Sequence, residues 1–233
     1  MKWKRAKMKL SDNTISVLKN YSTINQNLMI NMGSTLNTMS AMKNIVAKAT
    51  VEETFEKDVA IYDLNEFLAC MSLFTNLDLD FQDDFVMMKG ESNNSLKYWY
   101  SDPSVVTTVS KAIEMPQCEL NFTLSTEQLS EINRAAATIS APDMVLEAGN
   151  LRVTDKKNGT ANAYHAEIFD EQPDAVDYKF WFKVENLKLM SGTYDVNVSS
   201  NKISNFVNKN ADIEYFIALE PESYYGWGVE WKI

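Results

Sequence analysis

The sequence has few of the residues that most enzyme and metal sites require. Its 233 residues include one histidine and two cysteines. The histidine, His165, lies in a predicted strand beside Tyr164 with no partner motif nearby, so a strand or surface residue is favoured over a general base. The cysteines, Cys70 and Cys118, are isolated, which excludes a disulfide framework and zinc-site spacing. We expect no cofactor, and we interpret both thiols as small buried residues of a reducing cytoplasm.

Motifs for catalysis and for membrane insertion are also missing. The chain contains no P-loop, HExxH, GxSxG or dinucleotide glycine pattern. No apolar run long enough for a signal peptide or a membrane span follows the basic N-terminus. These absences favour a non-enzymatic protein that stays soluble where it is made and has no membrane partner.

One acidic cluster invites a metal interpretation. Asp170, Glu171, Asp174 and Asp177 lie close together in the sequence. They lack the ligand spacing of a known cation loop, so an outer loop is the simpler interpretation and a cation site is the alternative.

Four short segments have the capping residues or the apolar spacing of amphipathic helices. Ser11 and Asp63 are placed to cap the first and second, and Ser125 with Gln128 forms a capping box at the third. Apolar residues recur at helical spacing after these caps, with small polar residues on the opposite face. These patterns predict helices at residues 12–24, 64–74, 126–140 and 185–190.

The segments between these helices have strand character. They are rich in β-branched and aromatic residues and are bounded by Gly, Asn and Asp turn signals. The run Asp58–Phe74, DVAIYDLNEFLACMSLF, places a strand directly before a helix, and Phe180–Val198, FWFKVENLKLMSGTYDVNV, repeats that order. This internal repeat predicts an α+β fold of two similar domains, each with two short helices on antiparallel sheets.

The domain boundary is predicted from length and turn signals. A chain of this length allows two compact domains. The segment Ser101–Gln117 opens with Asp-Pro, has little helical periodicity and contains a second proline. We predict an N-terminal domain at residues 1–104 with a basic arm at 1–7, a linker at 105–117, and a C-terminal domain at 118–233 with an aromatic tail.

Five collinear segments resemble the sliding clamp of T-even bacteriophages, the DNA polymerase processivity factor. They are MKLSDNTISVLKNYSTIN at Met8–Asn25, DVAIYDLNEFL at Asp58–Leu68, DPSVV at Asp102–Val106, NLKLMSG at Asn186–Gly192 and EYFIALEPES at Glu214–Ser223. None is a catalytic signature, so the resemblance depends on the ordered set. The chain departs from the family at its ends, where MKWKRAK precedes the usual start and YYGWGVEWKI replaces a shorter end.

The resemblance implies the DNA-clamp fold and a homotrimeric ring of chains joined head to tail, with helices lining the hole. It implies a protein that encircles double-stranded DNA without sequence preference and tethers the phage DNA polymerase. It also implies a separate clamp loader, the host cytoplasm as location, and a second role as an activator of late transcription with late-transcription factors as partners. Edge strands, one from each domain, would join the chains. The alternative is a β-rich phage structural protein whose ring threads no DNA.

The DNA-facing candidates are basic residues near helix faces that also carry small polar side chains. Such a face attracts phosphates by charge and needs no contact with base edges. The candidates are Lys9, Lys19, Arg134, Lys183 and Lys188, and a solvated helix face is the alternative. The formal net charge is −10, and residues 111–233 hold 19 acidic against 11 basic residues. An acidic exterior with a modestly basic bore would leave the ring free to slide.

In related clamps an apolar pocket receives a short peptide of the polymerase. Carried onto this chain, the matching residues are Pro103, Val105, Val106, Ala218, Leu219 and Pro221. An apolar slot beside open backbone suits a short extended or one-turn peptide. The alternative is that these residues pack the linker onto its own domain. The tail with Trp227 and Trp231 is expected either to fold back onto this pocket or to cover the outer sheet of its domain.

Overall fold

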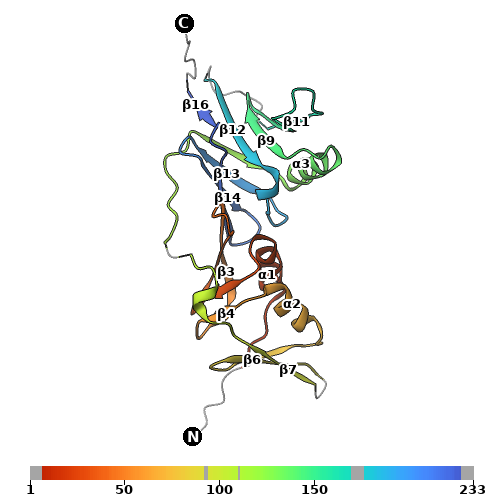
Figure 1. Cartoon of the computed structure of the whole chain (residues 1–233), viewed down its shortest axis with the longest axis vertical. Coiled ribbons are helices and arrows are strands. Elements are labelled where there is room, and N and C mark those ends of the chain that lie inside the picture. The colour runs from red at the N-terminus through yellow and green to blue at the C-terminus, as the bar shows by residue number, and fades with distance from the viewer. Residues whose placement is uncertain (1–6, 92–93, 110, 169–175, 227–233) are drawn as a thin grey trace. The chain divides into compact units, whose positions relative to one another are not determined.

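The computed structural model describes residues 7–91, 94–109, 111–168 and 176–226. The chain forms two compact units, Met1–Lys111 and Ala112–Ile233. The division between them falls within the segment 105–117 that the sequence predicts as a linker. A few short helices lie on antiparallel strands in the two units, which confirms the predicted α+β class (Figure 1).

The first unit contains two helices among short antiparallel strands. In chain order these elements are α1 (Asp12–Ile24), β1 (Leu28–Ile30), β2 (Gly33–Met39), β3 (Ile45–Phe55), β4 (Val59–Ile61), α2 (Leu64–Ser72), β5 (Asp78–Phe81), β6 (Phe85–Lys89), β7 (Ser95–Trp99) and the 3₁₀ turn η1 (Pro103–Val105). Strand β1 pairs with β4, β2 pairs with β3, and β5, β6 and β7 form a sheet in that order. Met8 adds an isolated bridge to Leu79 of β5.

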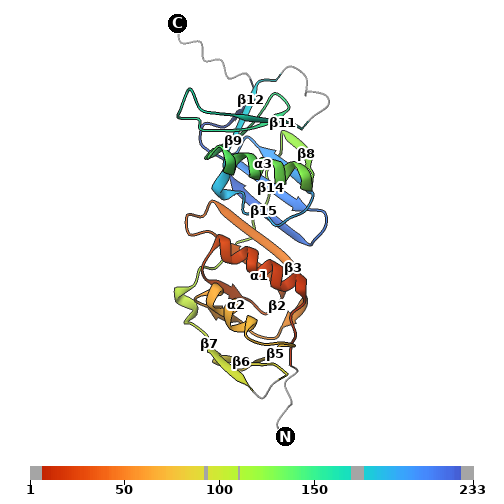
Figure 2. The ribbon, with the colours of Figure 1, turned by 90° about the vertical axis from the view of Figure 1, so that its right-hand side faces the viewer.

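The helices of the first unit cover its strands with the apolar stripes that the sequence predicts. Figure 2 shows α1 and α2 side by side, and α1 also packs on β2 and β3. Val17, Leu18 and Tyr21 are the buried side chains at the centre of α1, whereas Phe67 and Met71 are buried from α2. The opposite faces of both helices are therefore left for solvent or a ligand.

The second unit also combines helix with antiparallel strands, but among its described residues it has one α-helix, α3, and more strands than the first unit. In chain order its elements are β8 (Leu120–Leu124), α3 (Thr126–Thr138), β9 (Asp143–Glu147), β10 (Asn150–Thr154), β11 (Tyr164–Glu167), β12 (Tyr178–Lys183), the 3₁₀ turn η2 (Val184–Asn186), β13 (Tyr194–Ser199), β14 (Ile203–Asn208), β15 (Ile213–Ala218) and β16 (Tyr224–Tyr225). One sheet has the order β11-β10-β9-β12-β16, and β15, β14, β13 and β8 are neighbours in another. Helix α3 packs on β10 and β11 (Figure 1).

The predicted helix caps are observed. The Ser125 hydroxyl accepts a bond from the Gln128 N–H at 3.2 Å, and the Gln128 side chain accepts one from the Ser125 N–H at 2.9 Å. Asp63 accepts a bond from the Glu66 N–H at 3.0 Å, and this bond is the main reason why the pKa of Asp63 is lowered. Each cap satisfies backbone donors that the first helical turn leaves unpaired.

The helix predicted at residues 185–190 is wrong. The chain makes only the single turn η2 there, and Lys183, at the position before the turn, provides no side-chain cap. Helix nucleation fixes the backbone of several residues for a single hydrogen bond. Six residues without a cap form too few further bonds to offset this loss of entropy. The internal repeat is therefore partial: a strand leads into a helix at β4–α2 but into one turn at β12–η2.

Candidate nucleic-acid and partner surfaces

Two of the DNA-facing candidates lie together in the first unit. Lys19 is exposed on α1, and Lys9 is exposed just before that helix. Both line a groove of about 410 Å³ formed by residues of α1 and α2, whose apolar lining includes Ile15 and Leu68. The Lys9 ammonium lies 4.0 Å from a carboxylate oxygen of Asp78, a loose pair with both groups near solvent. The groove therefore carries two accessible positive charges beside one exposed carboxylate, that of Asp12.

Arg134 is the corresponding candidate in the second unit. It is exposed on α3, on the face opposite the buried residues Leu129 and Ile132. Glu127 and Glu131 are exposed on the same helix, so the charge of this face is mixed. Such a face makes few and weak phosphate contacts.

Lys183 and Lys188 have surroundings that differ from the expected helix face. The Lys183 ammonium lies 2.5 Å from Asp143, whose side chain is 1% exposed, and 3.8 Å from Glu220. A phosphate would have to compete with a buried carboxylate for Lys183, which weighs against a DNA-facing role. Lys188 lies after η2 and is half-buried, so it does not belong to a helix face.

The linker residues matched to the client pocket divide into two kinds. Val106 is 7% exposed and clusters with Met29 and Ala60, as the packing alternative expects for this residue. Val105 is 54% exposed, and Pro103 is also exposed. The η1 turn that carries both is rigid, because Asp102 accepts a bond from the Ser104 N–H at 2.8 Å.

The end of β15 shows the same division. Leu219 is buried, whereas Ala218 and Pro221 are exposed. After Leu219 the chain makes a turn in which the Ser223 N–H donates to the Glu220 carbonyl at 3.0 Å. Of the two exposed apolar residues here, Ala218 ends the strand and Pro221 lies on the turn that follows it.

The described part of the aromatic tail extends its own sheet. Tyr224 and Tyr225 form β16, which pairs with β12. The Tyr225 ring stacks on Tyr178 and Phe180, with centroids 6.2 and 6.3 Å apart. For these two tyrosines this arrangement fits the sheet-covering alternative. Trp227 and Trp231 lie outside the described residues.

Each unit presents an edge strand with alternating exposure. Strand β7 ends the order β5-β6-β7, and its Trp99 is 61% exposed. The Lys97 ammonium lies 4.2 Å from the Phe85 ring centroid and 4.8 Å from that of Trp99, which holds the indole in place. Strand β11 is the corresponding edge of the second unit's five-stranded sheet.

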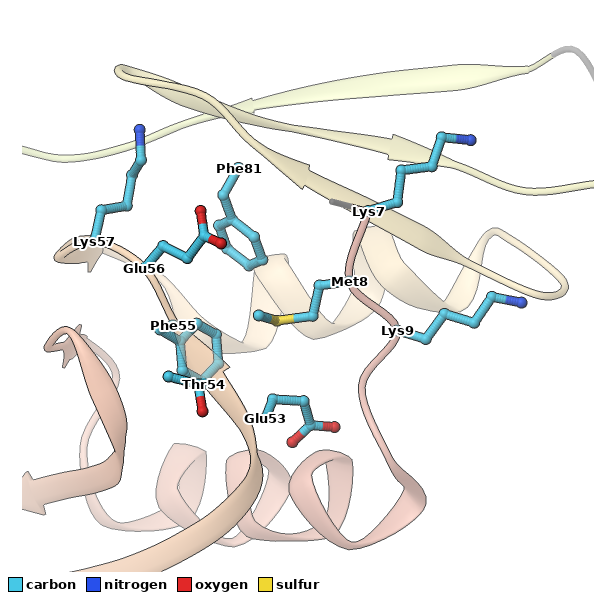
Figure 3. Close-up of a pocket in the computed structure, with 9 residues that line it drawn as sticks. All are labelled: Lys7, Met8, Lys9, Glu53, Thr54, Phe55, Glu56, Lys57 and Phe81. Carbon is cyan, nitrogen blue, oxygen red and sulfur yellow. The ribbon is translucent and has the colours of Figure 1, made fainter. Parts of the chain in front are cut away.

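The cavity at the start of the chain has no catalytic arrangement among its lining residues. It has a volume of about 330 Å³ and is lined by Lys7, Met8, Lys9, Glu53, Thr54, Phe55, Glu56, Lys57 and Phe81. Figure 3 shows Met8 pointing in toward the two phenylalanines, whereas the three lysines point away. Lys57 donates to the Gln82 carbonyl and to Asp83, each at 2.9 Å, and Lys7 pairs with Asp78 at 3.1 Å. The Lys7 contact fastens the N-terminal segment to β5, and the Lys57 contacts join the turn after β3 to the turn after β5.

The histidine, the cysteines and the acidic cluster share no site. His165 is exposed on β11, and both cysteines are free thiols whose pKa is raised by burial. In the part of the chain that the structure describes, no three His, Cys, Asp or Glu side chains are grouped to hold a metal ion. Of the acidic cluster only Asp177 is described, and it accepts a bond from the Tyr224 hydroxyl at 2.9 Å. Across the same residues no helix is long and apolar enough to cross a membrane.

Comparisons with known proteins identify the family. Residues 9–94 match the family model described as DNA polymerase processivity factor. The sliding clamp of Vibrio phage KVP40 is 33% identical over 223 residues, which cover 91% of this chain and 99% of the relative. That of Enterobacteria phage T4 is 26% identical, with 93% and 98% covered.

The fold comparison agrees. A solved structure described as the C-terminal region of FEN-1 bound to A. fulgidus PCNA has a TM-score of 0.67 at 15% identity, covering 90% of this chain and 95% of that chain. These relatives support the clamp interpretation over a structural ring protein. The chain therefore belongs to the phage sliding clamps, the non-enzymatic processivity factors of DNA polymerase.

Proposed function

We propose that three copies of this clamp form a ring around duplex DNA in the infected host cell and hold the phage DNA polymerase at the primer end. The observation that carries the proposal is the 33% identity to a phage sliding clamp over nearly the whole of both chains. The exposed helix faces support it, because they carry few charges and would slide past phosphates without a tight grip.

For the bore we propose Lys9, Lys19 and Arg134 as the phosphate-facing residues. All three are exposed, and each lies on a helix or next to its start. The DNA-facing role of Lys188 stays a prediction. Lys183 is left out because of its bond to Asp143.

For client proteins we propose the exposed apolar residues Pro103 and Val105 on η1, and Ala218 and Pro221 at the end of β15. Backbone bonds hold the η1 turn and the two ends of the Glu220–Ser223 turn, and Ala218 belongs to β15, which lowers the cost of ordering these residues on binding. The PCNA relative is solved with a chain end of a partner, which supports the same class of ligand here. The clamp loader and the late-transcription role stay predictions.

For ring closure we propose the edge strands β7 and β11. Pairing of β7 of one copy with β11 of the next would continue a sheet across the interface and cover both open edges. Such a contact is heterologous and repeats around the ring.

Primer extension tests the proposed function. The DNA polymerase encoded in the same genome copies a singly primed circular template with and without this protein and its loader. A processivity factor lengthens the product made in one binding event at a constant polymerase concentration. Unchanged product length, with the loader shown to be active, would instead support a ring protein that threads no DNA.

A further inference from the structure

Pro221 lies between two glutamates, Glu220 and Glu222, and both bind the side chain of Lys156. The Lys156 ammonium lies 3.0 Å from a carboxylate oxygen of Glu220 and 3.3 Å from one of Glu222. The Lys156 side chain is 13% exposed, so this lysine is largely covered. The Lys156 ammonium therefore binds the turn on both sides of the proline, whereas Lys183 approaches Glu220 alone, at 3.8 Å.

Lys156 is itself held in place from the neighbouring strands. Its backbone N–H donates to Asp143 at 3.1 Å, and its ammonium lies 5.7 Å from the Trp181 ring centroid. The other oxygen of Asp143 accepts the bond from Lys183. Lys156 follows β10, and its backbone is thus fixed to β9 through Asp143 while its ammonium lies near Trp181 of β12.

The backbone bonds of the turn fix its ends and not its tip. The Glu220 N–H donates to the Trp181 carbonyl at 2.8 Å, and the Trp181 N–H donates to the Ser223 hydroxyl at 2.8 Å. Pro221 has no N–H with which to make such a bond. The Pro221 ring is therefore placed through the bonds of its neighbours, among them the two bonds that Lys156 donates to Glu220 and Glu222. Lys202 adds a bond to the Ser223 carbonyl at the end of the turn.

The pKa shifts of Lys156 and Glu222 agree with this arrangement. Burial alone would lower the pKa of Lys156, but the bonds that its ammonium donates to Glu220 and Glu222 outweigh burial and raise that pKa. The pKa of Glu222 is lowered, first by a bond from its own N–H and then by Lys156. Without the ammonium, two carboxylates in one turn would repel each other.

We infer that Lys156 is a positioning residue for client binding: it holds the Glu220–Ser223 turn in the form in which Pro221 and Ala218 meet a client peptide. The inference rests on the proposed client contacts. Lys156 would act by preorganisation of the turn, because a turn that is already in its bound form loses less entropy when the peptide binds. The substitution of Lys156 therefore acts on affinity without removing any atom that touches the peptide.

The test uses full-length protein with three substitutions. Lys156→Met keeps the length of the side chain and removes its charge, and Lys156→Arg keeps the charge. Lys209→Met is the matched control, because Lys209 also forms an ion pair in this unit, 3.0 Å from Asp195, but half of its side chain is exposed and it does not touch the turn. Fluorescence anisotropy measures the affinity for a labelled C-terminal peptide of the DNA polymerase from the same genome, at 25 °C and well below the melting temperature. Hydrogen exchange measures the protection of residues 220–225.

We expect Lys156→Met to weaken peptide binding by about tenfold, with faster exchange confined to the turn. Lys156→Arg should recover most of the affinity, and Lys209→Met should leave it unchanged. A purely structural role would lower the melting temperature of Lys156→Met while its affinity for the peptide stayed that of the wild type, and this result would overturn the inference. If the wild type fails to bind the peptide, the proposed client contacts are wrong. In that case the role of Lys156 in client binding is also refuted, and the exchange data decide whether Lys156 holds the turn: faster exchange in Lys156→Met shows that it does, and unchanged exchange shows that it does not.

Discussion

Glu53 shows how a single residue can complete the N-terminal cap of a helix that lies far away in the sequence. Ser11 caps α1 as the sequence predicts, and its hydroxyl accepts a bond from the Thr14 N–H at 3.2 Å. The carboxylate of Glu53, on β3, then accepts bonds from the Ser11 N–H and from the Thr14 hydroxyl. These bonds explain why Thr14, a polar residue, is fully buried on α1. A carboxylate at this end of a helix is also favoured by the helix dipole.

Replacement of Glu53 by alanine should lower the free energy of unfolding by about 1–3 kcal/mol, because it leaves two donors without their acceptor. For a chain of this size that loss lowers the melting temperature by about 2–10 °C. Glu56→Ala is the control, since Glu56 is exposed near the same end of β3. Calorimetry on both variants checks this. If Glu53→Ala melts at the same temperature as Glu56→Ala, Glu53 contributes nothing to stability beyond the Ser11 cap.

At the scale of elements, the sequence predicts what is encoded locally. The helices α1, α2 and α3 were predictable because their caps and apolar stripes lie within one short window each. The segment after β12 has similar apolar spacing but no cap, and it forms only η2. Strand β16 was not predicted, because two residues give no periodicity and their pairing with β12 is a tertiary contact.

The candidate site was less predictable for the same reason. The bond between Lys183 and Asp143 joins residues 40 positions apart, and nothing near Lys183 in the sequence indicates it. The burial of Val106 against Met29 and Ala60 is likewise long-range. Exposure of Lys19 and Arg134, by contrast, follows from helix periodicity alone, and the structure agrees with it.

The exposed faces of α1 and α3 give a prediction about the loading of the clamp on DNA. The double substitution Lys19→Ala and Arg134→Ala should reduce the amount of clamp loaded on nicked circular DNA and make loading less dependent on salt, because each lost phosphate contact removes about 0.9 from the log–log salt slope. The control is Lys89→Ala with Lys157→Ala, which removes two exposed positive charges, again one from each unit. Loading is measured by gel filtration of clamp–DNA complexes across a salt series. Equal loss in both double variants would indicate a general charge effect and remove Lys19 and Arg134 from the bore.

At the scale of the whole molecule, the open sheet edges favour assembly. An edge strand with unpaired backbone groups is prone to pair with another chain unless it is short, charged or covered. Strand β7 carries one lysine, but that lysine is engaged with Phe85 and Trp99 and leaves the indole 61% exposed. A cavity of about 500 Å³ beside it is lined by residues that include Tyr62 and Leu96. An exposed tryptophan that lines a hollow of mixed apolar and polar side chains is typical of a protein interface.

Trp99→Glu should therefore convert the ring to single chains. We expect light scattering at micromolar concentration to give three chain masses for the wild type and one for Trp99→Glu, because the carboxylate would have to be buried against the next copy. Met42→Glu is the control, since Met42 is 83% exposed in the turn between β2 and β3 and receives the same change of charge. It should keep the mass of the wild type. The melting transition of Trp99→Glu should show a folded chain, because the indole is on the surface. A trimeric mass for Trp99→Glu would move the interface away from β7, and a wild type that stays a single chain at every concentration would contradict the ring itself.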